Sequence, residues 1–138
     1  MAVGILVDCF YYELGHRDFV HSFFSTISYH LEKERWGTKY PLIMNELYND
    51  KLNWDDVSVA KVNLIEIEQE LSKYMPEQVI WDIDDLSQKP PWGDKIRPKV
   101  TSLANYFATT SGKTFIEVLL TAMDVAEEDK CDLRFHKL

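Results

Sequence analysis

The sequence predicts a single α+β domain over residues 1–138, with a small mixed or antiparallel sheet packed against about four helices. Three observations carry this prediction. The chain has 138 residues, of which 46% are hydrophobic, and this suits one domain with a real core. Apolar residues recur with both the period of a strand and the period of a helix. The two kinds of segment mix without the regular alternation of a parallel α/β fold.

The first half of the chain predicts one strand and three helices. Residues 2–12 are almost continuously apolar, which is typical of a central strand buried on both faces. Phe and Ile recur at helical spacing over 17–35, and a short helix is expected near 41–49. Asn53 stands where an N-cap would begin a long helix over 54–74.

The second half predicts three short strands and one helix. Segments 79–83 and 101–107 have the composition of strands, and prolines mark residues 84–99 as a loop between them. A last helix is expected at 113–128, from its apolar stripe. The alternation of residues over 131–135 favours a closing strand.

The negative charge is concentrated in the middle third of the chain. Residues 45–94 contain twelve acidic and four basic residues, and the formal net charge of the whole chain is -8. The chain therefore lacks the basic footprint of a nucleic-acid-binding protein. An acidic surface attracts basic partners and speeds their encounter, although the same residues would also simply keep a protein soluble.

The sequence shows no sign of a membrane or secreted protein. No apolar run approaches the roughly 18 residues of a membrane span, and the N-terminus lacks the basic region of a signal peptide, so a cytoplasmic protein is expected. Cys9 and Cys131 form no disulfide framework. We expect two reduced, mostly buried thiols, with Cys9 in the middle of the first strand rather than acting as a nucleophile.

Asp82, Asp84 and Asp85 form the most suggestive cluster, with Asp94 in the same loop. Clustered carboxylates can hold a divalent cation, so one interpretation is a small metal-dependent hydrolase that uses the first three. A solvated acidic loop or a surface that binds a partner would also account for the cluster. Trp81 and Trp92 flank the cluster. We expect Trp81 in the core, while Trp92 is open between core and interface anchor.

Other motifs favour structural roles. Segment 111–114, Ser-Gly-Lys-Thr, lacks the first glycine of a phosphate-binding loop and predicts a tight turn before a helix. The spacing of the histidines does not suit zinc, and His16 is expected at the surface or as a cap rather than in an acid–base pair with Asp18. Phe10 and Phe23 belong to an aromatic group that predicts core, or alternatively a pocket for a flat ligand. No metal and no cofactor is expected.

Several segments recur together in one known family. They are Val3-Gly4-Ile5-Leu6-Val7-Asp8, Tyr12-Glu13-Leu14-Gly15-His16-Arg17-Asp18-Phe19, Trp81-Asp82-Ile83-Asp84-Asp85-Leu86, Pro90-Pro91-Trp92-Gly93 and Leu103-Ala104-Asn105-Tyr106-Phe107, followed by Gly112-Lys113. Together these segments resemble the immunity protein 70 family of bacterial polymorphic toxin systems, and the Pro-Pro-Trp-Gly segment is the most specific of them.

The resemblance implies a non-enzymatic antidote of contact-dependent growth inhibition. Such a protein stays in the producing cell and binds the toxic C-terminal domain of a cognate toxin, which in many systems is a nuclease. The partner expected is therefore a basic protein, with no role for nucleic acid or membrane. From charge alone, the contact surface is expected on the outer face of helix 54–74 and on loop 82–94. Its candidate residues are Glu66, Glu70, Asp82, Asp84, Asp85 and Trp92.

Overall fold

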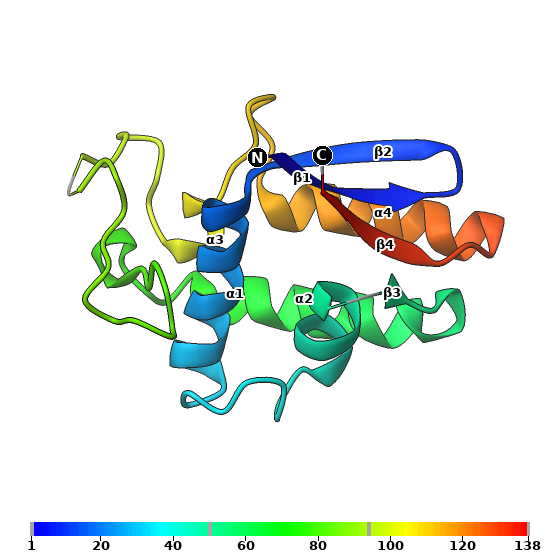
Figure 1. The fold of residues 1–138 in the computed structure, drawn as a ribbon, viewed down its shortest axis with the longest axis horizontal. Coiled ribbons are helices and arrows are strands. Elements are labelled where there is room, and N and C mark those ends of the chain that lie inside the picture. The colour runs from blue at the N-terminus through cyan, green and yellow to red at the C-terminus, as the bar shows by residue number, and fades with distance from the viewer. Residues whose placement is uncertain (1, 50, 94, 138) are drawn as a thin grey trace.

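The sheet has four strands in the order β2-β1-β4-β3, and every neighbouring pair is antiparallel (Figure 1). The computed structural model describes residues 2–49, 51–93 and 95–137. The sheet and the helices described below confirm the α+β prediction. Of the two predicted sheet types, mixed and antiparallel, the described residues form the antiparallel one. The strands are β1 (Ala2–Val7), β2 (Phe10–His16), β3 (Lys51–Leu52) and β4 (Leu133–Lys137).

The single strand expected over 2–12 is wrong, because the chain reverses within it. Residues Asp8 and Cys9 form a two-residue turn, and β1 and β2 pair from Val7 with Phe10 onwards. Asp8 has a φ of 54°, a left-handed conformation that Asp tolerates better than most residues. The turn carries no glycine, so the apolar run conceals it. Cys9 is consequently exposed, and its expected place in the core is wrong as well.

Four α-helices occur in the described residues, together with shorter helical turns. The expected helix over 17–35 ends at position 31, because Lys33 and Glu34 have φ values of 53° and 67°. The predicted cap at Asn53 precedes a 3-10 turn, and its side chain makes no capping bond. The elements are α1 (Arg17–Leu31), α2 (Val57–Leu71), α3 (Leu103–Tyr106), α4 (Phe115–Asp129), the π-helix η1 (Leu42–Leu47) and the 3-10 helices η2 (Trp54–Asp56) and η3 (Pro76–Gln78).

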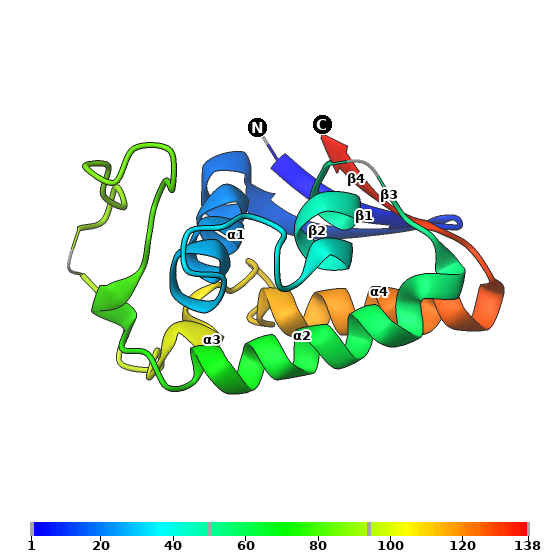
Figure 2. The ribbon, with the colours of Figure 1, turned by 90° about the horizontal axis from the view of Figure 1, so that it is seen from below.

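The core lies between the sheet and the helices. Helix α4 packs against β1, β2 and β4, and α2 packs against both α4 and α1 (Figure 2). Alternate residues of β1, namely Val3, Ile5 and Val7, are buried against these helices. The aromatic rings of Phe23 and Phe24 from α1 fill the centre. None of the helices in the described ranges combines the length and the apolar character of a membrane span.

Two segments predicted as strands have other structures. Residues 79–83 form no ladder with the sheet, and residues 103–106 are the short helix α3. Ser102 begins α3 as its N-cap, with its hydroxyl accepting a hydrogen bond from the Ala104 amide. The sequence Ser-Leu-Ala-Asn therefore acts as a capping signal, which the strand prediction overlooked.

The turn and helix predicted around residue 113 are confirmed. Gly112 has a φ of 90°, and Thr114 caps α4 through a hydrogen bond from the Glu117 amide. The Glu117 carboxylate accepts the Thr114 amide in return, which completes a capping box. The Ser-Gly-Lys-Thr segment is thus a turn and a helix start, as expected.

Candidate partner-binding surface

One face of α1 carries polar side chains that hold the segment following η3. Ser22, Ser25 and Thr26 are fully buried, which is unusual for hydroxyl residues on a helix that faces a core. Ser22 Oγ donates a hydrogen bond to the carbonyl of Ile80 at 2.8 Å, and Thr26 Oγ1 accepts from the Ile80 amide at 3.1 Å. The Ile83 amide donates to Ser25 Oγ at 3.2 Å.

These bonds explain why residues 79–83 are not a strand. Side chains of α1 pair with the amide and the carbonyl of Ile80 and with the amide of Ile83, which are groups that a neighbouring strand would otherwise bind. His30 extends the same row, with its Nε2 2.7 Å from the carbonyl of Gln78. The segment lies along α1 on the side that Figure 1 shows at the left, and it delivers the acidic residues 82–85 to the surface beside the helix.

His21 joins α1, η1 and the acidic segment in one hydrogen-bonded chain. Its Nδ1 lies 2.7 Å from the hydroxyl of Tyr48, and its Nε2 lies 3.2 Å from Oδ1 of Asp82. With a neutral ring, Tyr48 donates to Nδ1 and the Nε2 hydrogen is donated to Asp82. The same Asp82 oxygen also accepts the Asp84 amide at 2.9 Å, which fixes the turn that presents Asp84.

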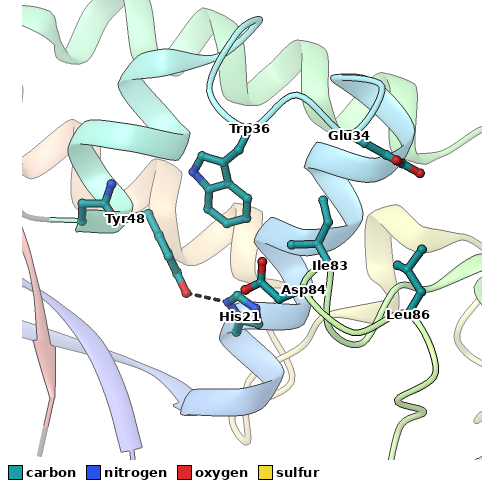
Figure 3. Close-up of a pocket in the computed structure, with 8 residues that line it drawn as sticks. His21, Glu34, Trp36, Tyr48, Ile83, Asp84 and Leu86 are labelled. Carbon is teal, nitrogen blue, oxygen red and sulfur yellow. Dashed lines mark hydrogen bonds between the residues drawn. The ribbon is translucent and has the colours of Figure 1, made fainter.

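A hollow of about 400 Å³ opens beside the hydrogen bonds of His21, and we call it the His21 pocket (Figure 3). The carboxylate of Asp84 points into it between His21 and Trp36, and Tyr48 forms one wall. A second hollow of about 320 Å³ adjoins it across His21 and Tyr48, and Arg17 lies there. The lining residues of the His21 pocket are His21, Glu34, Trp36, Tyr48, Asn49, Ile83, Asp84 and Leu86.

The three predicted acids of the loop have three different surroundings. Asp82 is bonded to His21, whereas Asp84 is exposed and its carboxylate has no hydrogen bond or ion pair with the described residues. Asp85 turns away, and hydrogen bonds from Ser87 and Gln88 lower the pKa of its carboxyl. Asp94, the fourth acid considered, lies outside the described residues.

Three residues here are placed so that they could hold a metal ion together, and they are not the three aspartates expected from the sequence. His21, Asp82 and Asp84 each offer a ligand atom, and these atoms lie within 4.8 Å of one another. Asp85 does not take part. The spacing of the histidines among themselves gives no hint of this arrangement, because His21 meets the aspartates only in the fold. The hydroxyl residues on one face of α1 were the signal that could have brought His21 to this loop.

Trp92 is bound to the rest of the structure by its own side chain. Its indole Nε1 donates to the hydroxyl of Tyr106 at 2.7 Å, and its ring packs edge-on against Phe19 and Trp81. It remains 38% exposed. Trp81 stacks on Phe19 and is half-buried, so it lies at the margin of the core rather than inside it. Trp92 therefore anchors the loop, and part of its ring is left at the surface.

Glu66 and Glu70 lie on a different part of the surface, on α2. They border the loop that follows α1, where burial and then the neighbouring Glu66 carboxylate raise the pKa of Tyr40. The Glu70 carboxylate accepts a 2.6 Å hydrogen bond from Lys73, which lowers the pKa of Glu70. The structure thus places the candidate acids in two groups, one on α2 and one on the loop beside α1.

An apolar stripe runs along the outer face of α2, beside the first group. Val59, Val62 and Ile65 are 55%, 66% and 43% exposed, at spacings of three residues. This face is therefore less polar than the charged residues of helix 54–74 predict. The signal available in the sequence was the repeated β-branched residue outside the buried stripe, which a purely solvated face does not require.

The aromatic residues do not form the alternative ligand pocket. Phe23 is buried in the core, whereas Phe10 is 47% exposed beside the β1–β2 turn and stacks on Tyr12. His16 has the capping role expected of it, because its Nδ1 accepts a hydrogen bond from the Asp18 amide at the start of α1.

Comparison with known proteins gives one family. The model of the family described as Immunity protein 70 matches residues 5–135. No curated protein and no solved structure matches the chain. The matched range includes the second half of β1, all of β2, the four α-helices and the acidic segment.

Proposed function

Because this chain belongs to the immunity protein 70 family, which implies an immunity protein that acts against a toxin, we propose that it binds the toxic C-terminal domain of a cognate bacterial toxin and neutralises it without catalysis. The match over residues 5–135 is the observation that carries this function. It covers nearly the whole chain, so the family assignment includes both candidate surfaces.

The target is a nuclease, and the mechanism is occlusion. A nuclease needs a basic groove for its substrate, and an acidic protein can occupy that groove in place of the phosphate backbone. The net charge of -8 and its concentration in residues 45–94 support this mechanism. Complementary charge also speeds association, which suits an antidote that must reach a toxin before the toxin reaches nucleic acid.

The contact surface combines acidic and apolar residues. Asp84 and Asp85 are exposed on the loop, and Glu66 is exposed on α2 beside the apolar stripe Val59, Val62 and Ile65. An apolar stripe next to carboxylates has the composition of an interface in which charge guides the encounter and buried area holds the complex. A tight complex would bury on the order of 1,200–2,000 Å² in total.

Charge reversal tests both the function and the surface. The loop variant carries Asp84→Lys and Asp85→Lys, and the α2 variant carries Glu66→Lys and Glu70→Lys. Each is co-expressed with the toxin domain encoded beside this gene, and survival and association rate are measured. We expect each variant to associate about tenfold more slowly at low salt, with weaker protection. Asp82 is left unchanged because it holds His21 and the Asp84 turn.

The control has the same change in net charge at a distant place. Glu13→Lys with Glu128→Lys adds the same four charge units, on β2 and on the far end of α4 (Figure 1). We expect association and protection close to those of the wild type. If the wild-type chain protects against none of the neighbouring toxin domains, the immunity function is wrong. If both charge-reversal variants protect as well as the control, only the acidic surface is wrong.

A metal-dependent hydrolase remains the second candidate, because His21, Asp82 and Asp84 stand within 4.8 Å of one another. Imidazole and carboxylate are suitable ligands for Mn²⁺ or Zn²⁺. Calorimetric titration with Mg²⁺, Mn²⁺ and Zn²⁺ decides the matter. Stoichiometric binding that Asp84→Ala abolishes would favour the hydrolase, and a flat titration would remove it.

A further inference from the structure

We propose that the His21 pocket receives the guanidinium group of an arginine side chain from the partner protein. This deepens the immunity function and rests on it. The aromatic rings of Trp36 and Tyr48, with the Asp84 carboxylate beside them and without a partner among the described residues, supply the two kinds of contact that a guanidinium makes best, stacking and charge-assisted hydrogen bonding.

The aromatic walls are fixed before any ligand arrives. The indole Nε1 of Trp36 donates to the carbonyl of Met44 in η1 at 3.0 Å, which sets the orientation of the ring. The rings of Trp36 and Tyr48 have centroids 5.3 Å apart, and the Tyr48 hydroxyl is held by His21. Because the polar atoms of both rings are occupied, a ligand meets the part of each ring that lines the pocket and that neighbouring rings leave uncovered. Phe24 already packs on Tyr48 with centroids 4.5 Å apart, and His21 stacks on Trp36. A cation placed over an aromatic face is attracted by it.

The charged residues that line the pocket are all negative. Asp84 and Glu34 are exposed carboxylates among its lining residues, and no lysine or arginine stands among the lining residues that the structure describes. Arg17 lines the adjoining hollow, together with Tyr48. Burial, then Asp84 and Asp82, raise the pKa of Tyr48, and Arg17 opposes this effect in part.

The groups already in use in the pocket favour arginine over a metal ion. Both ring nitrogens of His21 have partners, Tyr48 and Asp82, so a metal ion would have to displace one of them. A guanidinium needs only the groups left open, which are the Asp84 carboxylate and the parts of the Trp36 and Tyr48 rings that line the pocket. Ile83 and Leu86 complete the lining with aliphatic surface that suits the methylene stem of an arginine.

The test uses the complete chain and a small probe, so it does not need the toxin. Isotope-labelled protein is titrated, with a chelator present, with arginine blocked at both ends as acetyl and methylamide. We expect saturable NMR shifts at Trp36, Tyr48 and Asp84. The equally blocked citrulline has the same shape without the charge, and we expect no saturation with it. Blocked lysine should bind more weakly, since an ammonium cannot stack or form a bidentate pair.

Matched variants locate the site. Asp84→Asn should weaken the binding of blocked arginine about threefold to tenfold, because it removes the charge that faces the rings. Glu13→Gln should leave the binding unchanged, because Glu13 lies on β2 and is not among the lining residues of the His21 pocket. Both positions are exposed, and equal urea midpoints for the two variants verify that they fold alike.

Four results would overturn the arginine pocket. The first two are the absence of a saturable NMR shift and shifts centred elsewhere. The others are binding of blocked citrulline as tight as that of blocked arginine, and binding of blocked arginine by the Asp84→Asn variant as tight as by the wild type. These results are distinguishable from failure of the immunity function. Wild-type protein that protects against the toxin without binding blocked arginine disproves the pocket alone. Protein that binds blocked arginine and protects against no neighbouring toxin domain disproves the immunity function alone.

Discussion

Replacing Glu32 by glutamine should destabilise the protein, although the two side chains differ only in one oxygen atom that becomes an NH₂ group. Glu32 is 4% exposed and follows the last residue of α1. Its carboxylate accepts three backbone hydrogen bonds, each at 2.9 Å, from the amides of Gly37, Lys39 and Tyr40. These bonds close the loop that carries two lining residues of the His21 pocket.

The size of the effect follows from the geometry. An amide has one accepting oxygen, which can serve Lys39 and Tyr40, so its NH₂ group then faces the buried Gly37 amide. One charge-assisted bond, worth about 1.5–3 kcal/mol, is lost, and a buried donor is left unsatisfied at a cost of about 1–3 kcal/mol. Relief from burying a carboxylate offsets part of this loss. We expect a net decrease of about 2 kcal/mol in the free energy of unfolding.

Urea unfolding followed by tryptophan fluorescence measures this decrease. With a slope of about 2 kcal/mol per molar urea, the midpoint should fall by about 1 M. Glu34→Gln is the matched control: it makes the same exchange two residues away on an exposed side chain, and its effect should stay within about 0.5 kcal/mol. Equal midpoints for the two variants would refute the role given to the Glu32 carboxylate.

Two further predictions concern the sheet and the tyrosines. Gly4→Ala should lower the free energy of unfolding by about 1–3 kcal/mol, because a Cβ there would lie 2.6 Å from the Tyr11 ring and from the Tyr12 carbonyl; an unchanged thermal midpoint would contradict this. Burial raises the pKa of Tyr48 and of Tyr106, so their stabilising contribution is complete below about pH 10 and is lost as the pH rises through their folded values. The part of the tyrosinate absorbance that belongs to Tyr48 and Tyr106 should therefore appear together with unfolding, whereas titration of all the tyrosines in a still-folded protein would disprove the prediction.

Periodicity identified the three long helices and the closing strand correctly, but it missed the short helix α3. The apolar stripes of α1, α2 and α4 and the alternation that leads into β4 are features of single segments, which a sequence displays directly. The β1–β2 hairpin was missed because the turn uses Asp8 in a left-handed conformation without a glycine. The sequence around that turn is as apolar as a continuous strand.

The site required information that periodicity does not contain. Asp82, Asp84 and Asp85 look equivalent in the sequence, and only the structure separates the one bonded to His21 from the one left open and the one turned away. The strand expected at 79–83 failed for the same reason. Its hydrogen-bonding partners are hydroxyl groups of α1, more than fifty residues earlier in the chain.

The manner in which α1 holds residues 78–83 separates the residues that fix this segment from those proposed to contact a partner. Side chains of α1 bind the main chain of the segment at Gln78, Ile80 and Ile83, so few of the segment's own side chains take part in holding it. On the proposed contact surface, the neighbouring side chains can be replaced while Ser22, Ser25, Thr26 and the sheet stay the same. Under that proposal, grafting the corresponding stretch from a relative onto this chain is a route to an antidote with a new target.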